Sequence, residues 1–359
     1  MAEHMAGFFS SWLVYLILVL LHLIIPARKV EGYVRNEARG RPYVYRINGI
    51  YVLILALGAW AILGRLEIMS YDWFYRHRWS GLAGAVTLGL LSSLALVAGA
   101  PKVRRNVLVD FFLGRRFSPQ FFGGRVDAKM ILYLVGAVML GVNILSFAAH
   151  NVLSYGFSAP IVLYCALFFW FLLDYMIFEH VHLYTYDLVA ERVGAKLVFG
   201  CLAFYPYFYP VGLWALADRA PSDAPSLLFL VAAVVFFTGW VLARGANMQK
   251  FIFKRNPDRE FLGLIEPRTI GDGERQVLCS GFWGLSRHIN YLGEVLMASG
   301  LTLALGYPGA LLAWLYPLYY VLLLSTRQVD DDRRCRAKYG DLWEEYEEQV
   351  RWRIIPGIW

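Results

Sequence analysis

The chain alternates between long apolar stretches and shorter polar ones, a pattern typical of a protein that crosses a membrane several times. The stretch 291–325 is interrupted by Gly306-Tyr307-Pro308-Gly309, a turn signal that predicts a hairpin of two helices. Other stretches long and apolar enough to span a membrane lie at residues 8–25, 48–64, 80–99, 130–148, 159–178, 195–217 and 226–243. We therefore expect an all-α polytopic membrane protein with about eight to ten transmembrane helices.

Basic residues are distributed unevenly among the polar segments between these helices. Nearly all of the 34 Lys and Arg residues fall in segments 26–47, 100–129, 179–196 and 244–290 and in the tail from 327. The alternate segments hold only Arg65, Arg76, Arg78 and Arg219. Since cytoplasmic loops are enriched in Lys and Arg, this predicts an N-terminus outside and a C-terminus in the cytoplasm. The net charge of +7 thus indicates orientation and argues against nucleic-acid binding.

Composition supports a membrane protein and excludes several common kinds of site. Hydrophobic residues make up 58% of the chain and charged residues 17%, whereas soluble domains carry about 25% charged residues. The cysteines at 165, 201, 279 and 335 are too scattered for a disulfide framework or a zinc site. Rossmann, Walker A and H-E-x-x-H motifs are absent from the sequence, so we expect no metal and no soluble nucleotide-binding domain.

The first segment of chemical interest follows the fifth apolar stretch. Asp174 comes directly after an unbroken apolar run, and Glu179 follows shortly after it. An ionisable residue at membrane depth indicates function by default, and a proton donor in an apolar pocket needs a carboxyl group with a raised pKa. The alternative is interhelical hydrogen bonding at the membrane edge. His180 and His182 point in different directions on a helix, so we do not predict a metal site there.

Tyrosines and prolines interrupt the sixth stretch. Tyr205 and Tyr209 flank Pro206-Tyr207-Phe208, and Pro210 follows. Broken backbone at membrane depth is tolerated where it is buried in protein or lines a cavity. The two tyrosines are therefore candidates for lining a lipid pocket, and an interfacial aromatic belt is the alternative.

Cationic and aromatic residues gather in the polar segment after the seventh stretch. Lys250 and Lys254 lie one helical turn apart, and with Arg255 they form a patch suited to phosphates or, equally, a basic cytoplasmic flank. The segment from Gly281 to Glu294 combines an aromatic ring, a cation, an amide and a phenol in Trp283, Arg287, His288, Asn290 and Tyr291. We interpret it as a candidate nucleotide cradle.

An amphipathic stretch continues beyond the predicted hairpin. Arg327 and Asp331 are four residues apart, and Cys335, Lys338, Tyr339 and Tyr346 follow. By spacing alone, a solvated C-terminal helix would explain this stretch equally well.

Taken in order, these segments resemble the sterol reductase family, which includes the carbon-14, carbon-7 and carbon-24(28) reductases and the lamin B receptor. The resemblance runs from about Val109 to Trp359. The matching elements are Asp110-Phe-Phe-Leu-Gly114, Asp127-Ala-Lys129, Asn143, the stretch 174–187, Ala246-Asn-Met-Gln-Lys250, Gly281-Phe-Trp-Gly, Arg287-His-Ile-Asn-Tyr-Leu-Gly293, Cys335-Arg-Ala-Lys-Tyr339-Gly and Arg353-Ile-Ile-Pro-Gly-Ile-Trp359.

The resemblance implies a single membrane domain with three parts: 1–108, less similar to the family; 109–243, the substrate pocket; and 244–359, which binds NADPH. It implies cofactor contacts at Lys250, Lys254, Leu278, Trp283, Asn290, Tyr291, Asp331, Cys335, Tyr339 and Tyr346, and we add the neighbouring Arg255, Arg287, His288 and Lys338. It places substrate contacts around Asp174, where the family's Trp-Asn-Glu-Glu reads Ile177-Phe-Glu-His180. We count Asp174, His182, Tyr205 and Tyr209 as substrate-binding candidates.

The implied activity is NADPH-dependent reduction of a carbon–carbon double bond in a sterol or similar lipid, of the carbon-14 or carbon-7 type. Glu179 is our candidate proton donor, Arg327 and Asp331 would orient the nicotinamide, and Tyr346 would lie near the transfer. The expected location is a bacterial inner membrane or the endoplasmic reticulum, with the cofactor site on the cytoplasmic side. A methyltransferase acting on isoprenylcysteine or phospholipid, and a non-catalytic lipid-binding protein, remain alternatives.

Overall fold

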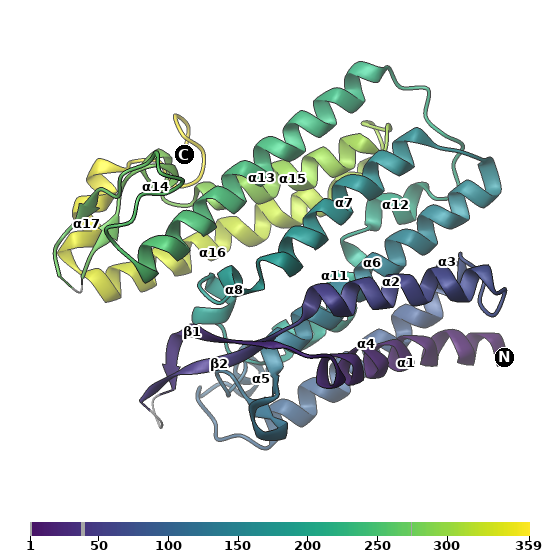
Figure 1. Cartoon of the computed structure of the whole chain (residues 1–359), viewed down its shortest axis with the longest axis horizontal. Coiled ribbons are helices and arrows are strands. Elements are labelled where there is room, and N and C mark those ends of the chain that lie inside the picture. Colours follow the sequence, from purple (N-terminus) through teal and green to yellow (C-terminus); the bar gives the residue numbers. More distant parts are fainter. Residues whose placement is uncertain (1, 37–39, 274) are drawn as a thin grey trace. The chain divides into compact units, whose positions relative to one another are not determined.

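The computed structural model describes residues 2–36, 40–273 and 275–359, and helices dominate it (Figure 1). The chain forms two compact units, Met1–Ser222 and Asp223–Trp359, named here the N-terminal and C-terminal units. The three parts predicted from the sequence, 1–108, 109–243 and 244–359, were defined by their expected functions and not by packing. That division stays a prediction.

Six helical segments in the described part of the chain are long and apolar enough to cross a membrane. They are α1 (Ala2–Ile24), α4 (Arg78–Ala98), α6 (Ala128–Tyr155), α7 (Ala159–Ile177), the broken segment Ala195–Leu216 and α13 (Ser226–Arg255). The apolar helix α2 (Gly49–Arg65) is shorter, with 17 residues. The predicted all-α, multi-pass membrane fold is confirmed, and the orientation of its termini stays a prediction.

The segment Ala195–Leu216 is broken where the sequence predicts a break. It consists of α10 (Ala195–Phe199), a π-helical turn over Gly200–Phe204, α11 (Tyr205–Phe208) and α12 (Val211–Leu216). Proline has no N–H to donate, so Pro206 and Pro210 weaken the regular helical hydrogen bonds here. The carbonyl of Pro206 instead accepts a hydrogen bond of 2.9 Å from the buried Asn143 amide of α6. Irregular backbone at membrane depth requires hydrogen-bond partners of this kind from within the protein.

The polar segment after α1 forms a β-hairpin that the apolar pattern did not predict. Strands β1 (Arg28–Asn36) and β2 (Arg41–Ile47) pair antiparallel, with Arg28 opposite Ile47. The Tyr45 ring packs over Gly32, where a Cβ atom would lie 2.5 Å from it. Two shorter antiparallel pairs also occur: β3 (Gln120–Phe121) with β4 (Val126–Asp127), and β5 (Thr269–Ile270) with β6 (Val277–Leu278).

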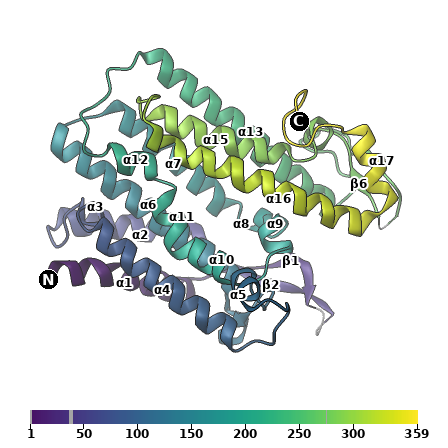
Figure 2. The same ribbon diagram turned by 180° about the vertical axis from the view of Figure 1, so that it is seen from behind.

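Helix α6 is the most buried of the membrane helices in the N-terminal unit, and α1 packs tightly against α4 (Figure 2). The Ser11 hydroxyl donates to the carbonyl of Gly81 at 2.8 Å, and the Trp12 indole donates to that of Gly84 at the same distance. A Cβ atom on Gly84 would lie 2.1 Å from the Phe8 carbonyl oxygen, so this crossing requires glycine. Small residues allow such close approach of membrane helices. The short helices α3 (Trp73–Arg76), α5 (Val107–Leu113), α8 (Glu179–His182) and α9 (Tyr186–Val189) lie between the longer ones.

Helices α13, α15 (Ile289–Ala304) and α16 (Leu315–Tyr339) run side by side in the C-terminal unit (Figures 1 and 2). The predicted hairpin is confirmed, because the chain turns after Ala304 and passes through a short 3-10 helix, Leu311–Trp314. Helices α13 and α15 cross at two glycines. A Cβ atom on Gly239 would lie 2.5 Å from the carbonyl oxygen of Gly293, and a Cβ atom on Gly293 would lie equally close to that of Gly239. The two backbones are therefore in direct contact.

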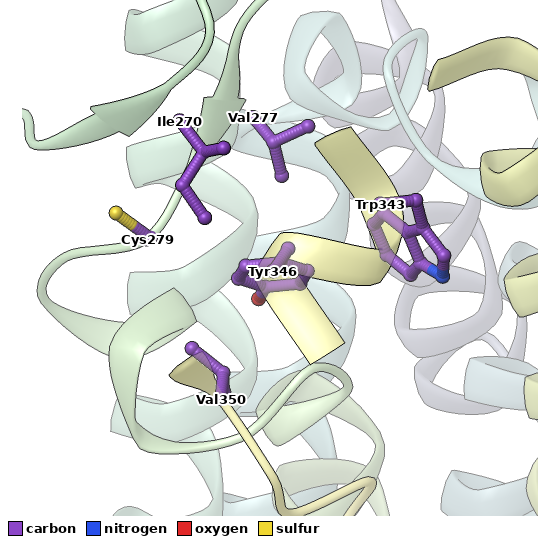
Figure 3. Close-up of a cluster of buried hydrophobic side chains, with 6 residues drawn as sticks. All are labelled: Ile270, Val277, Cys279, Trp343, Tyr346 and Val350. Carbon is purple, nitrogen blue, oxygen red and sulfur yellow. The ribbon is translucent and has the colours of Figure 1, made fainter. Parts of the chain in front are cut away.

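A small hydrophobic core closes the polar end of the C-terminal unit (Figure 3). It is built from β5, β6 and α17 (Asp341–Gln349), and comprises Ile270, Val277, Cys279, Trp343, Tyr346 and Val350. The tail then returns to the start of α15. The carbonyls of Trp352 and Arg353 accept hydrogen bonds from the backbone N–H groups of Arg287 and His288, at 3.0 and 2.8 Å. These bonds fix the segment that the sequence identified as a candidate cradle.

Candidate functional site

One face of α16 carries most of the candidate residues from the C-terminal stretch. Arg327, Asp331, Cys335 and Tyr339 follow one another at intervals of four residues, and each is partly buried. Residues four apart lie above one another on a helix, so the four side chains form one row. Burial raises the pKa of the Cys335 thiol to about 12, which keeps it protonated at neutral pH. The structure thus presents Cys335 as a packing or contact group and gives it no nucleophilic character.

The start of α15 meets this row through hydrogen bonds. The Tyr291 hydroxyl donates to Asp331 at 3.2 Å, and the His288 ring stacks on the Tyr291 ring at 5.1 Å between centroids. His288 Nε2 lies 3.0 Å from Asp332 Oδ1, while Nδ1 lies 3.7 Å from Asp331 Oδ2. Burial alone would raise the pKa of Asp332, but the His288 hydrogen bond and the nearby Arg287 charge hold it below its usual value. The network therefore favours a charged Asp332.

Two further residues of the cradle have buried polar atoms without a hydrogen-bond partner among the described residues. Arg287 is 5% exposed and forms an ion pair with Glu347 of α17, but its Nε atom has no such partner. Asn290 donates weakly to Asn247 of α13 at 3.5 Å, but its side-chain carbonyl oxygen is buried and has no hydrogen-bond partner in the described residues. Buried polar atoms are nearly always satisfied, so an orphan acceptor of this kind indicates a place for a donor from a ligand.

The basic residues at the end of α13 lie close to those of α16. Lys254 Nζ donates to the Tyr339 hydroxyl at 3.1 Å, and Lys338 Nζ lies 4.9 Å from the centre of the Tyr339 ring. Lys250 and Lys338 both lie near enough to repel the Lys254 ammonium group. Lys250 also lies over the Trp283 ring at 5.7 Å. Three cations gathered in this way create a field that favours an anion.

The other C-terminal candidates are positioned differently. Arg255 is exposed and packs over Phe251 of its own helix. Leu278 is buried in β6, paired with Thr269. Tyr346 is 1% exposed within the small core (Figure 3). Its hydroxyl donates to the Trp283 carbonyl at 2.7 Å. This position favours a role for Tyr346 in holding α14 (Phe282–Leu285) over a role in direct contact with substrate.

Glu179 is a buried carboxyl group of the N-terminal unit. It is 4% exposed at the start of α8, just after α7 ends. Burial raises the pKa of Glu179 to about 7, although the hydrogen bond that Oε2 accepts from the Gly49 N–H, at 2.9 Å, acts in the opposite direction. A carboxyl group that titrates near neutral pH can both hold and release a proton under working conditions.

Aromatic residues lie around Glu179. The His182 ring stacks on Tyr175 with 3.9 Å between centroids, and Tyr175 is within electrostatic range of both Glu179 and Tyr205. Tyr205 packs edge-on against Tyr209 at 4.5 Å. The structure thus brings together Glu179, His182, Tyr205 and Tyr209, which the sequence named from two separate segments. Asp174 is half-buried in the last turns of α7.

Several residues of these clusters were not identified from sequence. Asp332 follows Asp331 in a run of three aspartates, and only the fold shows that it binds His288. Tyr175 follows Asp174 in the sequence. It could have been identified as a candidate, because it is a phenol next to an acidic residue at the end of an apolar stretch. Gly49 gave no signal, because its importance lies in a contact with a residue 130 positions away. Within the described residues, no group of three or more His, Cys, Asp or Glu is arranged to hold a metal ion.

Comparison with known proteins identifies a single family over almost the whole chain. Residues 3–359 match the model of the "Ergosterol biosynthesis ERG4/ERG24 family". A Delta(14)-sterol reductase of Arabidopsis thaliana is 33% identical over 354 residues, which cover 94% of this chain and 91% of that protein. The Delta(14)-sterol reductase TM7SF2 of Mus musculus is 33% identical, covering 98% of this chain and 86% of that protein. A Delta(14)-sterol reductase of Methylotuvimicrobium alcaliphilum is 27% identical, covering 99% and 83%.

The match covers almost every residue, including the N-terminal helices, where the sequence elements alone gave little resemblance. The order of the elements and the whole-length similarity therefore have one explanation: this chain belongs to the ergosterol biosynthesis ERG4/ERG24 family.

Proposed function

We propose that the protein reduces a carbon–carbon double bond of a sterol, at carbon 14, with NADPH as the hydride donor. The relatives described above are all named Delta(14)-sterol reductases, which favours carbon 14 over carbon 7. The observation that carries the chemistry is Glu179, a carboxyl group buried among apolar and aromatic side chains with a pKa near 7. Protonation of an alkene needs such an acid in surroundings that exclude water.

The residues of the C-terminal unit suit NADPH. Lys250, Lys254 and Lys338 supply positive charge for phosphates, and a compact cluster of ammonium groups is a common phosphate-binding arrangement. The orphan carbonyl oxygen of Asn290 is an acceptor that suits an amide or hydroxyl donor. The Trp283 ring beside Lys250 offers a flat apolar surface for an aromatic base.

In the proposed ionic reduction, Glu179 supplies the proton and NADPH supplies the hydride. Glu179 gives its proton to one carbon of the double bond, so its O–H bond breaks, a C–H bond forms and the other carbon becomes a carbocation. NADPH, when bound, supplies the hydride that this second carbon accepts, and is thereby oxidised to NADP⁺. The apolar residues around Glu179 keep water from the cation. Solvent returns a proton to Glu179 before the next turnover.

The row on α16 has a positioning role in this proposal. The Tyr291 and His288 contacts hold Asp331 in a fixed orientation, and Asp332 anchors His288 from its other ring nitrogen. Arg327 lies one turn before Asp331 on the same face. A rigid network of this kind can orient a bound nicotinamide without reorganising during the reaction. We place this end of the protein on the cytoplasmic side, because most Lys and Arg residues lie in the segments assigned there.

The test is a reductase assay on the full chain purified in detergent. NADPH oxidation would be followed with sterols that carry a double bond at carbon 14, carbon 7 or carbon 24(28), and products would be analysed by mass spectrometry. We expect a gain of two mass units with the carbon-14 substrate, and deuterium incorporation from NADPH labelled at the transferred hydrogen.

Other outcomes would redirect the assignment. Turnover of a different sterol would support the reductase activity but assign it to another double bond. NADPH binding with no sterol reduced would contradict the proposed substrate. If the protein bound labelled S-adenosylmethionine and not NADPH, the methyltransferase alternative would replace the reductase.

A further inference from the structure

Helix α2 begins without a cap from its own sequence. Asn48 occupies the position before the first helical residue, yet its side chain forms no capping bond to α2. The Asn48 amide donates instead to the carbonyls of His22 and Ile25 at the end of α1, each at 3.1 Å, and its oxygen lies 2.6 Å from His22 Nδ1. Asn48 therefore ties the start of α2 to α1 and leaves the first N–H of α2 for another acceptor.

That acceptor is the Glu179 carboxylate. The Gly49 N–H donates to Glu179 Oε2 at 2.9 Å, across 130 residues of sequence. The first N–H groups of a helix have no intrahelical partner and attract negative charge. Oε2 is thereby fixed, while Oε1 accepts no hydrogen bond from the described residues. One oxygen of the carboxyl group is held by backbone, and the other remains open to exchange a proton.

Gly49 also provides the space that Glu179 occupies. A Cβ atom at position 49 would lie 2.6 Å from Glu179 Oε1 and 2.6 Å from Met176 Sδ. Both distances are far shorter than normal contacts, so any side chain there would displace the carboxyl group. The backbone of Gly49 is not among the positive-φ glycines, so space rather than conformation requires the glycine. At Gly58, on the same helix, a Cβ atom would meet nothing within 4 Å.

We propose that Gly49 is a positioning residue for Glu179: its N–H fixes Oε2 and its missing side chain leaves room for Oε1 in the orientation that transfers a proton. This inference rests on the proposed role of Glu179 as the acid. It adds that α2, which carries none of the residues named above as catalytic or binding candidates, sets the geometry of the reaction through its first residue.

The test is a double-mutant cycle between the two residues, with kcat and its pH profile as readouts. Gly49→Ala should lower kcat by about 10²-fold, the order of loss that misplacing a reacting group by about 1 Å produces. Glu179→Asp, which withdraws the carboxyl group by about 1.5 Å, should also lower kcat. In the double variant the shorter side chain makes room for the methyl group. Its kcat should therefore be at least about tenfold higher than the value expected if the two single reductions in kcat simply multiplied.

The matched control is Gly58→Ala, which adds the same methyl group to the same helix in open space. We expect it to keep wild-type kcat, KM for NADPH and pH profile. KM for NADPH should also stay unchanged in Gly49→Ala. A purely structural defect would instead lower the amount of folded protein and leave the kcat of the folded fraction and its pH profile intact.

The possible failures can be told apart. Wild-type kcat and pH profile in Gly49→Ala, or strictly multiplicative effects in the double variant, would overturn the positioning role while Glu179→Gln still tests the acid. Full activity in Glu179→Gln would overturn the proposed acid itself and, with it, this inference. If Gly49→Ala does not fold, the double variant decides: its folding with restored activity supports the steric coupling. Failure of both to fold would assign the contact to folding alone.

Discussion

Two buried carboxyl groups, one in each unit of the molecule, differ in the charge state that their surroundings favour. In the N-terminal unit, Glu179 is buried with one backbone N–H as its hydrogen-bond donor, and its pKa rises to about 7. In the C-terminal unit, Asp332 is also largely buried, yet His288 and Arg287 keep its pKa below the usual value. The same functional group is thus prepared to carry a proton in one place and a permanent charge in the other.

The difference follows from what surrounds each carboxyl group. Burial disfavours the charged form, and only ionised or strongly donating neighbours reverse that effect. A region that must deliver a proton gains from having few such neighbours, whereas a region that must hold an anionic cofactor needs an ordered set of charges. Pairs of titratable groups whose surroundings move their pKa values apart are a common sign of divided catalytic roles.

Replacing Glu179, the proposed proton donor, should have the largest effect on activity. Glu179→Gln keeps the shape and can still accept the Gly49 N–H, but it cannot give a proton to the alkene. We expect kcat to fall by about 10²- to 10⁴-fold, the usual contribution of a general acid, with the affinity for NADPH unchanged. Steady-state kinetics and a cofactor-binding titration would check this. An active Glu179→Gln enzyme would contradict the proposed difference in role between Glu179 and Asp332.

The pH dependence of turnover should follow Glu179. The acid is active in its protonated form, so kcat should be constant below pH 7 and fall about tenfold per pH unit above it. Asp332 has a lowered pKa and stays charged across this range, so NADPH binding should not follow the same curve. The measurement is a pH–kcat profile at saturating NADPH beside a pH series of NADPH binding. A shared midpoint for both would contradict the proposed division of roles.

Removing a cation from the C-terminal unit should affect binding and leave chemistry intact. Lys254→Ala should raise KM for NADPH by about tenfold, equivalent to about 1.4 kcal/mol, with little change in kcat at saturation. The loss should shrink at high salt, which screens the attraction between the remaining cations and the phosphates. Arg333→Ala is a suitable control, because its side chain is 76% exposed on α16. Equal effects of both variants would indicate a general charge effect in place of a site.

The smallest effect is expected at Cys335. Its buried thiol has a pKa of about 12, so hardly any thiolate exists at neutral pH. Cys335→Ala should change kcat less than about twofold, and alkylation of Cys335 by N-ethylmaleimide should be slow until the protein is denatured. Mass spectrometry of labelled peptides would show this. Rapid labelling in the folded protein would reveal a reactive thiol in the row on α16.

The sequence predicted the features that depend on local spacing. Apolar runs predicted the membrane helices, Gly306-Tyr307-Pro308-Gly309 predicted the turn before α16, and Pro206 with Pro210 predicted the broken segment. Helical spacing likewise related Arg327 to Asp331. Each of these inferences needs only residues within a few turns of one another.

Features that depend on distant contacts could not be predicted in the same way. Strands β1 and β2 carry Arg28, Lys29, Glu31, Arg35 and Arg41 at exposed positions, which gave this segment the composition of a loop. Tyr346 is buried in the small core with its hydroxyl bonded to the Trp283 carbonyl, a position that its spacing along the chain did not indicate. Gly49 is one of 32 glycines, and only the fold shows that Glu179 fills the space beside it.

The hydrogen bonds from Trp352 and Arg353 to the segment 287–288 have a consequence for biosynthesis. A ribosome makes these two carbonyl groups after every helix of the described chain, so these hydrogen bonds cannot form while α13, α15 and α16 are being synthesised. The nascent protein therefore passes through a stage in which its helices are inserted and its cradle is still open. Synthesis of residues 352–353, rather than synthesis of α15 itself, is the event that allows this segment to be fixed.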